Sequence, residues 1–296
     1  MLAIETDRLT KFYGSHRGIE DVTIAVEQGE VFGFLGPNGA GKTTTIRTLL
    51  DLLHPTRGSA SIFGLDSHRD SVSIRARLGN LPGDFGYGKR ATGREAAALL
   101  AQLRGIGTLD RAETLARRFR ADLERPLGQL SRGNRQKVGL ILAMFHQPEL
   151  LILDEPTSGL DPLMQEEFLT LVREERERGC AVFISSHELD EVERVCDRVG
   201  IIRGGRLIAV ERVADLLGKT QRRVSLEFAE PIDLGELRRC PGVSDLETDG
   251  GRVTFRVAGD IDPVIKAISR HTVADLELAH PTLEEVFLTY YEDGTT

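Results

Sequence analysis

The sequence has no tryptophan and only three cysteines among 296 residues. Cys180, Cys196 and Cys240 are far apart and form no C-x-x-C pair, which is typical of a reducing compartment rather than of a disulfide-stabilised secreted domain. The seven histidines show no ligand-like spacing with cysteine or with one another. We therefore expect neither disulfides nor structural zinc.

Long apolar segments and an excess of positive charge are also missing. The longest apolar run, residues 138–145, is far too short to cross a bilayer, and the first residues have no signal-peptide pattern. With 46 acidic against 38 basic side chains, the net charge is −8, so no direct nucleic-acid binding is expected. These features predict a cytoplasmic protein with no membrane span of its own, which meets a membrane only through a partner.

The most informative segment is a glycine-rich nonapeptide that fits the phosphate-loop pattern G-x-x-x-x-G-K-[ST]. In this motif backbone N–H groups surround phosphate oxygens, Lys42 neutralises phosphate charge, and Thr43 can ligate magnesium. Residues 30–35 before it are strand-like and residues 43–50 after it have helical spacing, which disfavours an ordinary glycine-rich turn. A nucleoside triphosphate is the predicted ligand. Its candidate contacts are Gly36, Pro37, Asn38, Gly39, Ala40, Gly41, Lys42, Thr43 and Thr44.

A second strong signal is the segment Leu-Leu-Ile-Leu-Asp-Glu at residues 150–155. It reads as a buried strand whose end delivers two adjacent carboxylates. In phosphoryl transfer one such acid holds magnesium and a second polarises the attacking water. We assign Asp154, with Thr43, to the metal and Glu155 to the water, with Lys42 also catalytic; a strand capped by a solvated acidic turn is the alternative.

Five segments in order resemble the motif set of the ATP-binding subunits of ABC transporters. They are the phosphate loop, Leu-Ser-Arg-Gly-Asn at 130–134, Leu-Ile-Leu-Asp-Glu-Pro at 151–156, Ser-Gly-Leu-Asp at 158–161 and Ser-Ser-His at 185–187. The resemblance covers roughly residues 3–210. The last 80 residues are similar to the tail of the drug- and antibiotic-exporter branch.

The resemblance implies an ATPase that uses ATP and Mg²⁺ to power a separate transmembrane permease subunit, peripheral on the inner face of the cell membrane. It implies an exporter of drugs, antibiotics or lipophilic compounds. Ser131 and Gly133 would close over ATP bound by the other protomer of a homodimer, or of a pair with another ATPase subunit. Asp161 would join the two sites, His187 would reach the γ-phosphate and attacking water, and Tyr13 would stack on adenine. A plain helix cap, a surface histidine and a core tyrosine are the ordinary alternatives for Ser131, His187 and Tyr13.

Two departures from the family pattern stand out. The family usually has glutamine after the strand near residues 78–81, whereas this chain has Gly83 followed by Asp84. Asp84 is our candidate for a substitute magnesium contact. The signature segment also carries Arg132 and Asn134 where glycine and glutamine are commoner.

The predicted fold is an α/β phosphate-loop NTPase domain of ABC type over residues 1–216, followed by a smaller α+β ferredoxin-like domain over residues 217–296. Apolar runs at 150–153 and 181–184 are typical of parallel strands covered on both faces. A helical insertion is expected at about 90–125, with helix over 92–123 and Ala96, Leu99, Leu100 and Leu103 on one face.

The smaller domain shows a βαββαβ pattern. We expect strands at 222–228, 243–247, 252–257 and 273–278, helices at 234–239 and 263–269, and a final helix from residue 281. This region shows no catalytic constellation, so a regulatory, docking or dimerising role is expected.

Two other functions compete with transport. An ABC-type ATPase of DNA repair or translation is disfavoured because the chain has no long coiled-coil insertion and no second ATPase half. A phosphate-loop kinase is disfavoured by the signature and Ser-Ser-His segments. By analogy, residues 84–90 and the helical insertion are the candidate surface for docking the permease.

Overall fold

A computed structural model describes residues 1–84, 88, 90–219, 221–230 and 232–279. The chain divides into two compact units, Met1–Arg212 and Val213–Thr296, where the sequence predicts a boundary at 216/217. The helix expected from residue 281 lies outside the described residues. Within them, every helix is too short or too polar to span a membrane.

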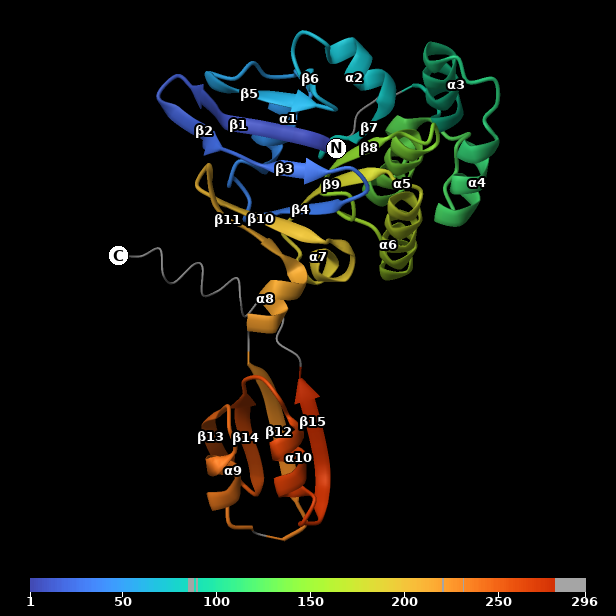
Figure 1. Ribbon diagram of the computed structural model, residues 1–296. Coiled ribbons are helices and arrows are strands. Elements are labelled where there is room, and N and C mark those ends of the chain that lie inside the picture. Colours follow the sequence, from blue (N-terminus) through green and yellow to red (C-terminus); the bar gives the residue numbers. More distant parts are fainter. Residues whose placement is uncertain (85–87, 89, 220, 231, 280–296) are drawn as a thin grey trace. The chain divides into compact units, whose positions relative to one another are not determined.

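A six-stranded sheet forms the centre of the first unit (Figure 1). Its order is β11 (Arg206–Arg212), β10 (Arg198–Arg203), β4 (Val31–Leu35), β9 (Ala181–Ser186), β8 (Leu150–Asp154) and β7 (Leu78–Leu81). The strands from β10 to β7 are parallel, and only β11 pairs antiparallel. Every residue of β4, β8 and β9 is buried, which confirms the expectation of parallel strands covered on both faces.

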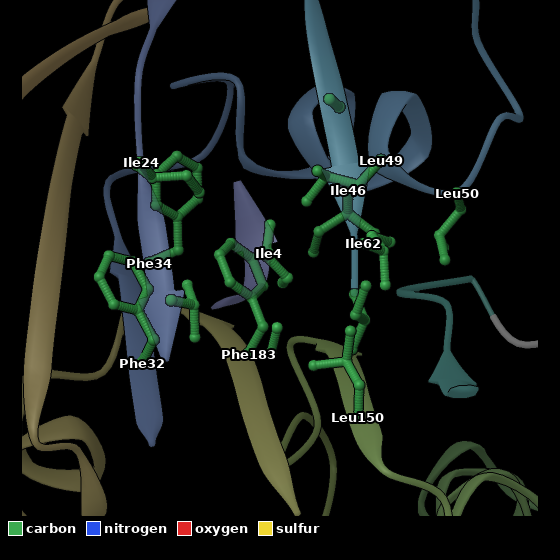
Figure 2. Close-up of a cluster of buried hydrophobic side chains, with 14 of the residues drawn as sticks. Ile4, Ile24, Phe32, Phe34, Ile46, Leu49, Leu50, Ile62, Leu150 and Phe183 are labelled. Carbon is green, nitrogen blue, oxygen red and sulfur yellow. The ribbon is translucent and has the colours of Figure 1, made fainter. Parts of the chain in front are cut away.

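A smaller antiparallel sheet covers one face of this sheet. It contains β2 (His16–Val22), β1 (Leu2–Tyr13), β5 (Arg57–Ile62) and β6 (Leu65–Asp66), with β3 (Ala25–Glu27) paired to β1. Between the two sheets, Ile4 and Ile62 share one apolar cluster with Phe34 and Phe183 (Figure 2). Ile46 of α1 (Lys42–Leu49) joins the same cluster, so core packing holds the helix that follows the phosphate loop.

Helices cover the remaining face of the six-stranded sheet. They are α5 (Arg132–Met144), α6 (Pro162–Glu177) and α7 (Leu189–Val195), while α2 (Ser71–Arg77) leads into β7. A short 3₁₀ turn, η1 (Leu127–Gln129), precedes α5. The helical insertion packs against α5 and α6 through α3 (Gly93–Arg104) and α4 (Asp110–Phe119).

The insertion corrects two expectations. The continuous helix over 92–123 is wrong, because Gly105 adopts φ +68° and ends α3. The expected apolar face is only partly right: Ala96 is buried and Leu100 is half-buried, but Leu99 and Leu103 are 52% and 73% exposed, and Ala97 and Ala101 are buried in addition. Small side chains allow α3 to lie close to its neighbours, and the leucines are left on the surface.

The second unit has the βαββαβ order expected from the sequence, preceded by α8 (Val213–Lys219). The elements are β12 (Arg222–Phe228), α9 (Gly235–Arg239), β13 (Val243–Asp249), β14 (Arg252–Val257), α10 (Asp262–Ile268) and β15 (Val273–Ala279). Its sheet is antiparallel throughout, in the order β13-β14-β12-β15. Alternate residues such as Val224, Leu226 and Phe255 are buried with the helices, and their neighbours are more exposed.

Candidate functional site

The phosphate loop runs from the end of β4 to the start of α1. Gly39 and Gly41 have φ of +80° and +111°, a region that favours glycine. A Cβ on Gly41 would lie 2.9 Å from the Gly18 carbonyl oxygen, so the loop is pressed against β2. Among the described residues no side chain caps the start of α1, which leaves first-turn N–H groups available to an anion.

Lys42 connects the phosphate loop with the end of β8. Its side chain is buried, and Nζ donates hydrogen bonds to the carbonyl oxygens of Gly36 (2.6 Å) and Pro37 (3.3 Å). The same Nζ lies 3.1 Å from Glu155 Oε1. One cation is therefore placed between the loop and Glu155, the carboxylate predicted to be catalytic.

Asp154 is almost completely buried and is held by two hydroxyl groups. Thr43 Oγ1 donates to Asp154 Oδ2 at 2.8 Å, and Ser185 Oγ donates to Oδ1 at 2.5 Å. A Cβ on Gly83 would lie 2.9 Å from Asp154 Oδ2, which brings the segment after β7 up to this carboxylate. The side chain of Asp84 itself is exposed.

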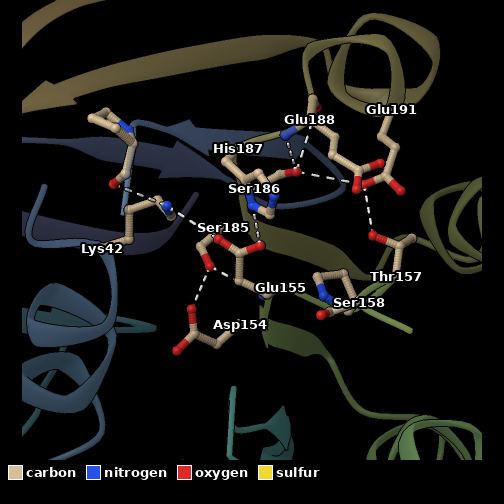
Figure 3. A network of polar contacts seen from close by, with 12 residues as sticks. Lys42, Asp154, Glu155, Thr157, Ser158, Ser185, Ser186, His187, Glu188 and Glu191 are labelled. Atoms are coloured by element: carbon tan, nitrogen blue, oxygen red, sulfur yellow. Dashed lines mark hydrogen bonds and ion pairs between the residues drawn. The ribbon is translucent and has the colours of Figure 1, made fainter. Parts of the chain in front are cut away.

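Glu155 follows with a left-handed backbone, φ +52°, which is rare for a residue other than glycine. Its N–H donates to the Ser185 carbonyl oxygen at 3.1 Å. His187 Nδ1 lies 2.5 Å from Glu155 Oε2, and Figure 3 shows Lys42 and His187 meeting this carboxylate from two sides. The structure thus brings together the three residues predicted to be catalytic.

A cavity of about 380 Å³ lies over the phosphate loop and is bordered by Tyr13, Arg17 and Glu155. Tyr13 is 46% exposed and packs on Gly18, because a Cβ there would lie 2.8 Å from Tyr13 Cε2. Tyr13 is therefore not a core tyrosine. Lys11 Nζ sits 5.7 Å from the centroid of its ring.

The signature segment forms the start of α5. Ser131 Oγ accepts a hydrogen bond from the Asn134 N–H at 3.3 Å, so Ser131 is the N-cap of this helix. A Cβ on Gly133 would lie 2.3 Å from the Gly159 carbonyl oxygen, so the two segments touch. Arg132, one of the departures from the family pattern, donates to Ser158 Oγ at 2.7 Å. The described contacts of Ser131 and Gly133 are therefore with the first turn of α5 and with Gly159.

Asp161 caps α6, where its Oδ1 accepts a hydrogen bond from the Met164 N–H at 3.1 Å. Lys137 Nζ lies 3.5 Å from Asp161 Oδ2. The Met164 N–H, assisted by Lys137, lowers the pKa of Asp161 below its ordinary value. This carboxylate therefore has a structural role within one chain, whatever it does between chains.

Two groups of site residues were missed by sequence reasoning. Gln136 Nε2 donates to the carbonyl oxygens of Glu155 (3.0 Å) and Pro156 (2.9 Å), which fixes the turn after β8. Thr157 Oγ1 donates to Glu191 Oε2 at 2.8 Å, and burial raises the pKa of Glu191 to about 7. Nothing in the sequence distinguishes Gln136 from its polar neighbours Arg135 and Lys137 at the start of α5.

The loop, the helix N-terminus and the paired carboxylates at the edge of a parallel sheet define a phosphate-loop nucleotide-binding ATPase domain. Comparison with known proteins narrows this class. The family profile described as ABC transporter matches residues 19–158. The bacitracin transport ATP-binding protein BcrA of Bacillus licheniformis is 41% identical over 228 residues, 76% of this chain and 74% of that protein. The daunorubicin resistance ATP-binding protein DrrA3 of Streptomyces coeruleorubidus is 33% identical over 300 residues, 97% and 95% of the two chains.

Solved structures agree with this placement. A structure described as the ATP-binding subunit of an ABC transporter has a TM-score of 0.68 and 32% identity, and the match covers 73% of this chain and 92% of that one. A dimeric ATP-binding cassette bound to ADP and Pi has a TM-score of 0.65 at 21% identity over 71% and 98% of the chains, which shows the fold alone. The chain therefore belongs to the ABC transporter family as an ATP-binding subunit, an ATPase that powers transport.

Proposed function

We propose that this chain hydrolyses ATP to power a membrane permease that exports drugs, antibiotics or other lipophilic compounds, at the cytoplasmic face of the membrane. The observation that carries the ATPase part is the convergence of Lys42, Glu155 and His187 beside the phosphate loop. The export part is supported by relatives whose names specify bacitracin transport and daunorubicin resistance.

The residues of the loop fit a magnesium nucleotide. Backbone N–H groups of residues 38–44 and Lys42 would hold the phosphates, and Tyr13 would stack on adenine. Thr43 and Asp154, whose oxygen atoms already meet at 2.8 Å, form the oxygen-donor pair that would hold Mg²⁺, with Asp84 as a further candidate. The ion would neutralise charge on the β- and γ-phosphates.

Glu155 is the proposed base that orients the attacking water, and His187 the proposed γ-phosphate contact. The 2.5 Å approach of His187 Nδ1 to Glu155 Oε2 limits the rotation of both side chains. The left-handed backbone of Glu155, held by the Ser185 carbonyl and by Gln136, directs the carboxylate toward the loop. Orientation of one water by a fixed carboxylate is how this site would raise the rate of hydrolysis.

Two chains are needed for a complete site in this proposal. One chain carries one phosphate loop and one signature segment, and the described contacts of Ser131 and Gly133 are with their own helix and with residue 159. We infer that these residues close over ATP held by the other protomer, with Asp161 between the two sites. The fold likeness to a dimeric cassette is consistent with this arrangement.

The test is a Glu155→Gln variant. Loss of the base should reduce turnover by about 10²–10⁴-fold while ATP binding is kept, and size-exclusion chromatography with light scattering should show an ATP-dependent dimer. Glu5→Gln, which changes an exposed carboxylate of β1, is the matched control and should hydrolyse ATP normally. Unchanged turnover in Glu155→Gln would assign the water to another residue.

The permease is proposed to dock on a groove beside the helical insertion. This cavity of about 250 Å³ is lined by Leu50, Leu52, Leu78, Leu100 and Leu142, among others. Leu99 and Leu103 of α3 add exposed apolar surface. We therefore expect an amphipathic cytoplasmic helix of the permease as the occupant. Of the residues 84–90 predicted for this role, 85–87 and 89 lie outside the described residues.

Two buried acceptor atoms belong to residues that line the groove. Asn80 Oδ1 and His146 Nδ1 have no hydrogen-bond partner among the described residues. Burial, assisted by Arg104, lowers the pKa of His146 to about 4, so its ring is neutral at pH 7. Nε2 donates to the Leu78 carbonyl oxygen at 3.1 Å, which leaves Nδ1 as an acceptor.

Site-directed crosslinking tests this assignment. Leu103→Cys in α3 should crosslink to a copurified permease, and Ile265→Cys in α10, an exposed position of the second unit, provides the control. Crosslinks that never place residues 84–120 beside a transmembrane subunit would remove the docking surface from the proposal. A cassette that copurifies with nucleic acid and without a membrane protein would favour the repair or translation alternative.

The second unit is proposed to be a ferredoxin-like accessory domain. Its βαββαβ order and its antiparallel sheet support this assignment. Deletion of residues 213–296 should leave ATP binding intact and change either permease coupling or dimer stability, which assays of transport and of ATP-dependent dimerisation would separate.

A further inference from the structure

Away from the nucleotide site, three potential metal ligands meet on the surface of the first unit. Ligand atoms of Asp51, His54 and His68 all lie within 4.8 Å of one another. His68 Nδ1 is 2.7 Å and His54 Nδ1 is 3.4 Å from Asp51 Oδ1. Two imidazoles and one carboxylate are a donor set that suits Zn²⁺ and related divalent transition ions.

The three residues are held in place by contacts that do not use their ligand atoms. Asp51 follows α1 with a left-handed backbone, φ +56°, and its N–H donates to the Thr48 carbonyl oxygen at 3.2 Å. The His54 carbonyl oxygen accepts a hydrogen bond from Lys11 Nζ at 2.7 Å. Such fixed backbones favour metal binding because little ordering is left to be done.

The loop that carries His68 is fixed in the same way. Asp66 Oδ1 accepts the N–H groups of His68 and Arg69, at 3.0 and 2.9 Å. The side chains of His54 and His68 are 70% and 63% exposed, and that of Asp51 is 14% exposed. An ion can therefore enter from solvent, and water can complete its coordination.

We propose that Asp51, His54 and His68 form a binding site for one Zn²⁺-class divalent transition ion, which ties the turn after α1 to the loop before α2. Tetrahedral Zn²⁺ with bonds of about 2.0–2.1 Å separates its ligand atoms by about 3.3–3.4 Å. The distance of 3.4 Å between His54 Nδ1 and Asp51 Oδ1 already has this value. His68 has to move back by about 0.6 Å, a shift that an exposed side chain makes by small rotations.

The local charges permit this site. Arg75 Nη2 lies 3.8 Å from Asp51 Oδ2, whereas His68 contacts the other oxygen, Oδ1. Arg75 also donates to the Leu50 carbonyl oxygen at 2.9 Å, so it holds the carboxylate from behind. Hydrogen bonding from His68 lowers the pKa of Asp51, so the carboxylate is ionised at neutral pH. A hydrogen-bonded cluster that takes no metal is the competing interpretation.

Metal titration of the full chain, without a histidine tag, tests the proposal. Zn²⁺ should bind at one equivalent by calorimetry, Co²⁺ should give the visible absorption of a nitrogen- and oxygen-ligated ion, and Tm should rise by about 5 °C at a hundredfold excess over Kd. His54→Ala and His68→Ala should each weaken binding by about tenfold or more. His16→Ala removes an exposed histidine outside the cluster and should bind normally.

Two results would overturn the site. Wild-type protein that takes up no Zn²⁺ shows a hydrogen-bonded cluster only. A His54→Ala/His68→Ala double variant that binds the same number of ions with the same affinity places the ion elsewhere, and loss of binding in His187→Ala would assign it to the nucleotide site.

Discussion

Two polar clusters lie beyond the two ends of α1, and they differ in burial and in the way that the sequence encodes them. At the start of the helix, Lys42 and Asp154 are buried. Beyond its end, His54 and His68 are largely exposed. The first cluster comes from motifs with a fixed order along the chain, whereas the second comes from two loops that tertiary packing brings together. Motif order reveals only the first kind of site.

Of the substitutions considered, removal of Lys42 from the buried cluster should change ATP affinity the most. Lys42→Ala deletes the only cation that contacts both the loop and Glu155 within the described residues. A charge-assisted contact worth about 3 kcal/mol corresponds to about a hundredfold loss of ATP affinity. Fluorescent-nucleotide titration measures the loss, with Lys266→Ala, an exposed lysine of α10, as the control. Affinity within twofold of wild type would mean that backbone N–H groups alone hold the phosphates.

The next largest effect is expected where two segments of the site touch. Gly133→Ala places a Cβ 2.3 Å from the Gly159 carbonyl oxygen, so one segment must shift. Overpacking costs about 1–3 kcal/mol, and we expect an ATPase rate at least about tenfold lower with ATP binding by the single chain unchanged. Gly107→Ala, where no atom lies within 4 Å of the new Cβ, is the matched control. Equal activity of the two variants would contradict the role of this contact.

Gln136→Ala should have a smaller effect, on stability and turnover together. The side-chain amide of Gln136 donates hydrogen bonds to the Glu155 and Pro156 carbonyl oxygens, and these two acceptors lose their donor in the variant. Stability should fall by about 1–2 kcal/mol in urea unfolding. Gln102→Ala, at an exposed position of α3, should leave stability nearly unchanged. If Gln136→Ala lowers stability without slowing hydrolysis, the turn does not position the catalytic carboxylate.

The sequence predicts the parts of the fold that depend on local pattern. Apolar runs identify β8 and β9, and period-two alternation identifies β12 and β14, whose bounds agree with prediction. The insertion was predicted less well, because alanines rather than leucines face α5, a choice made by the close approach of two helices. How closely two helices approach depends on tertiary packing, and the spacing of apolar residues within one helix carries no information on it.

The same division applies to the site. Residues in motifs, such as Lys42, Glu155 and His187, are found together where the order of segments predicts them. Gln136 and Glu191 were missed because their partners are a backbone turn and a hydroxyl group far away in sequence. The Asp51 cluster was likewise excluded by a spacing argument, which cannot detect ligands from separate loops.

The smallest expected effect is a pH dependence carried by Glu191. Burial, with a further contribution from Glu188, raises the pKa of Glu191 from 4.5 to about 7. The folded chain therefore keeps a proton that the unfolded chain has lost between these values, so stability falls as pH rises from 4.5 to about 7. Below pH 4.5 both states are protonated at this residue, and above 7 both are ionised, so the contribution is constant outside this window.

Glu191→Gln removes this proton exchange and keeps an amide in place of the carboxyl group beside Thr157. The difference in free energy of unfolding between the variant and the wild type should grow in favour of the variant from pH 4.5 to 7, measured by urea unfolding at several pH values. Glu193→Gln on the same helix is the control. A constant difference across this range would show that Glu191 is ionised throughout, in which case the Thr157 hydroxyl alone stabilises a buried charge.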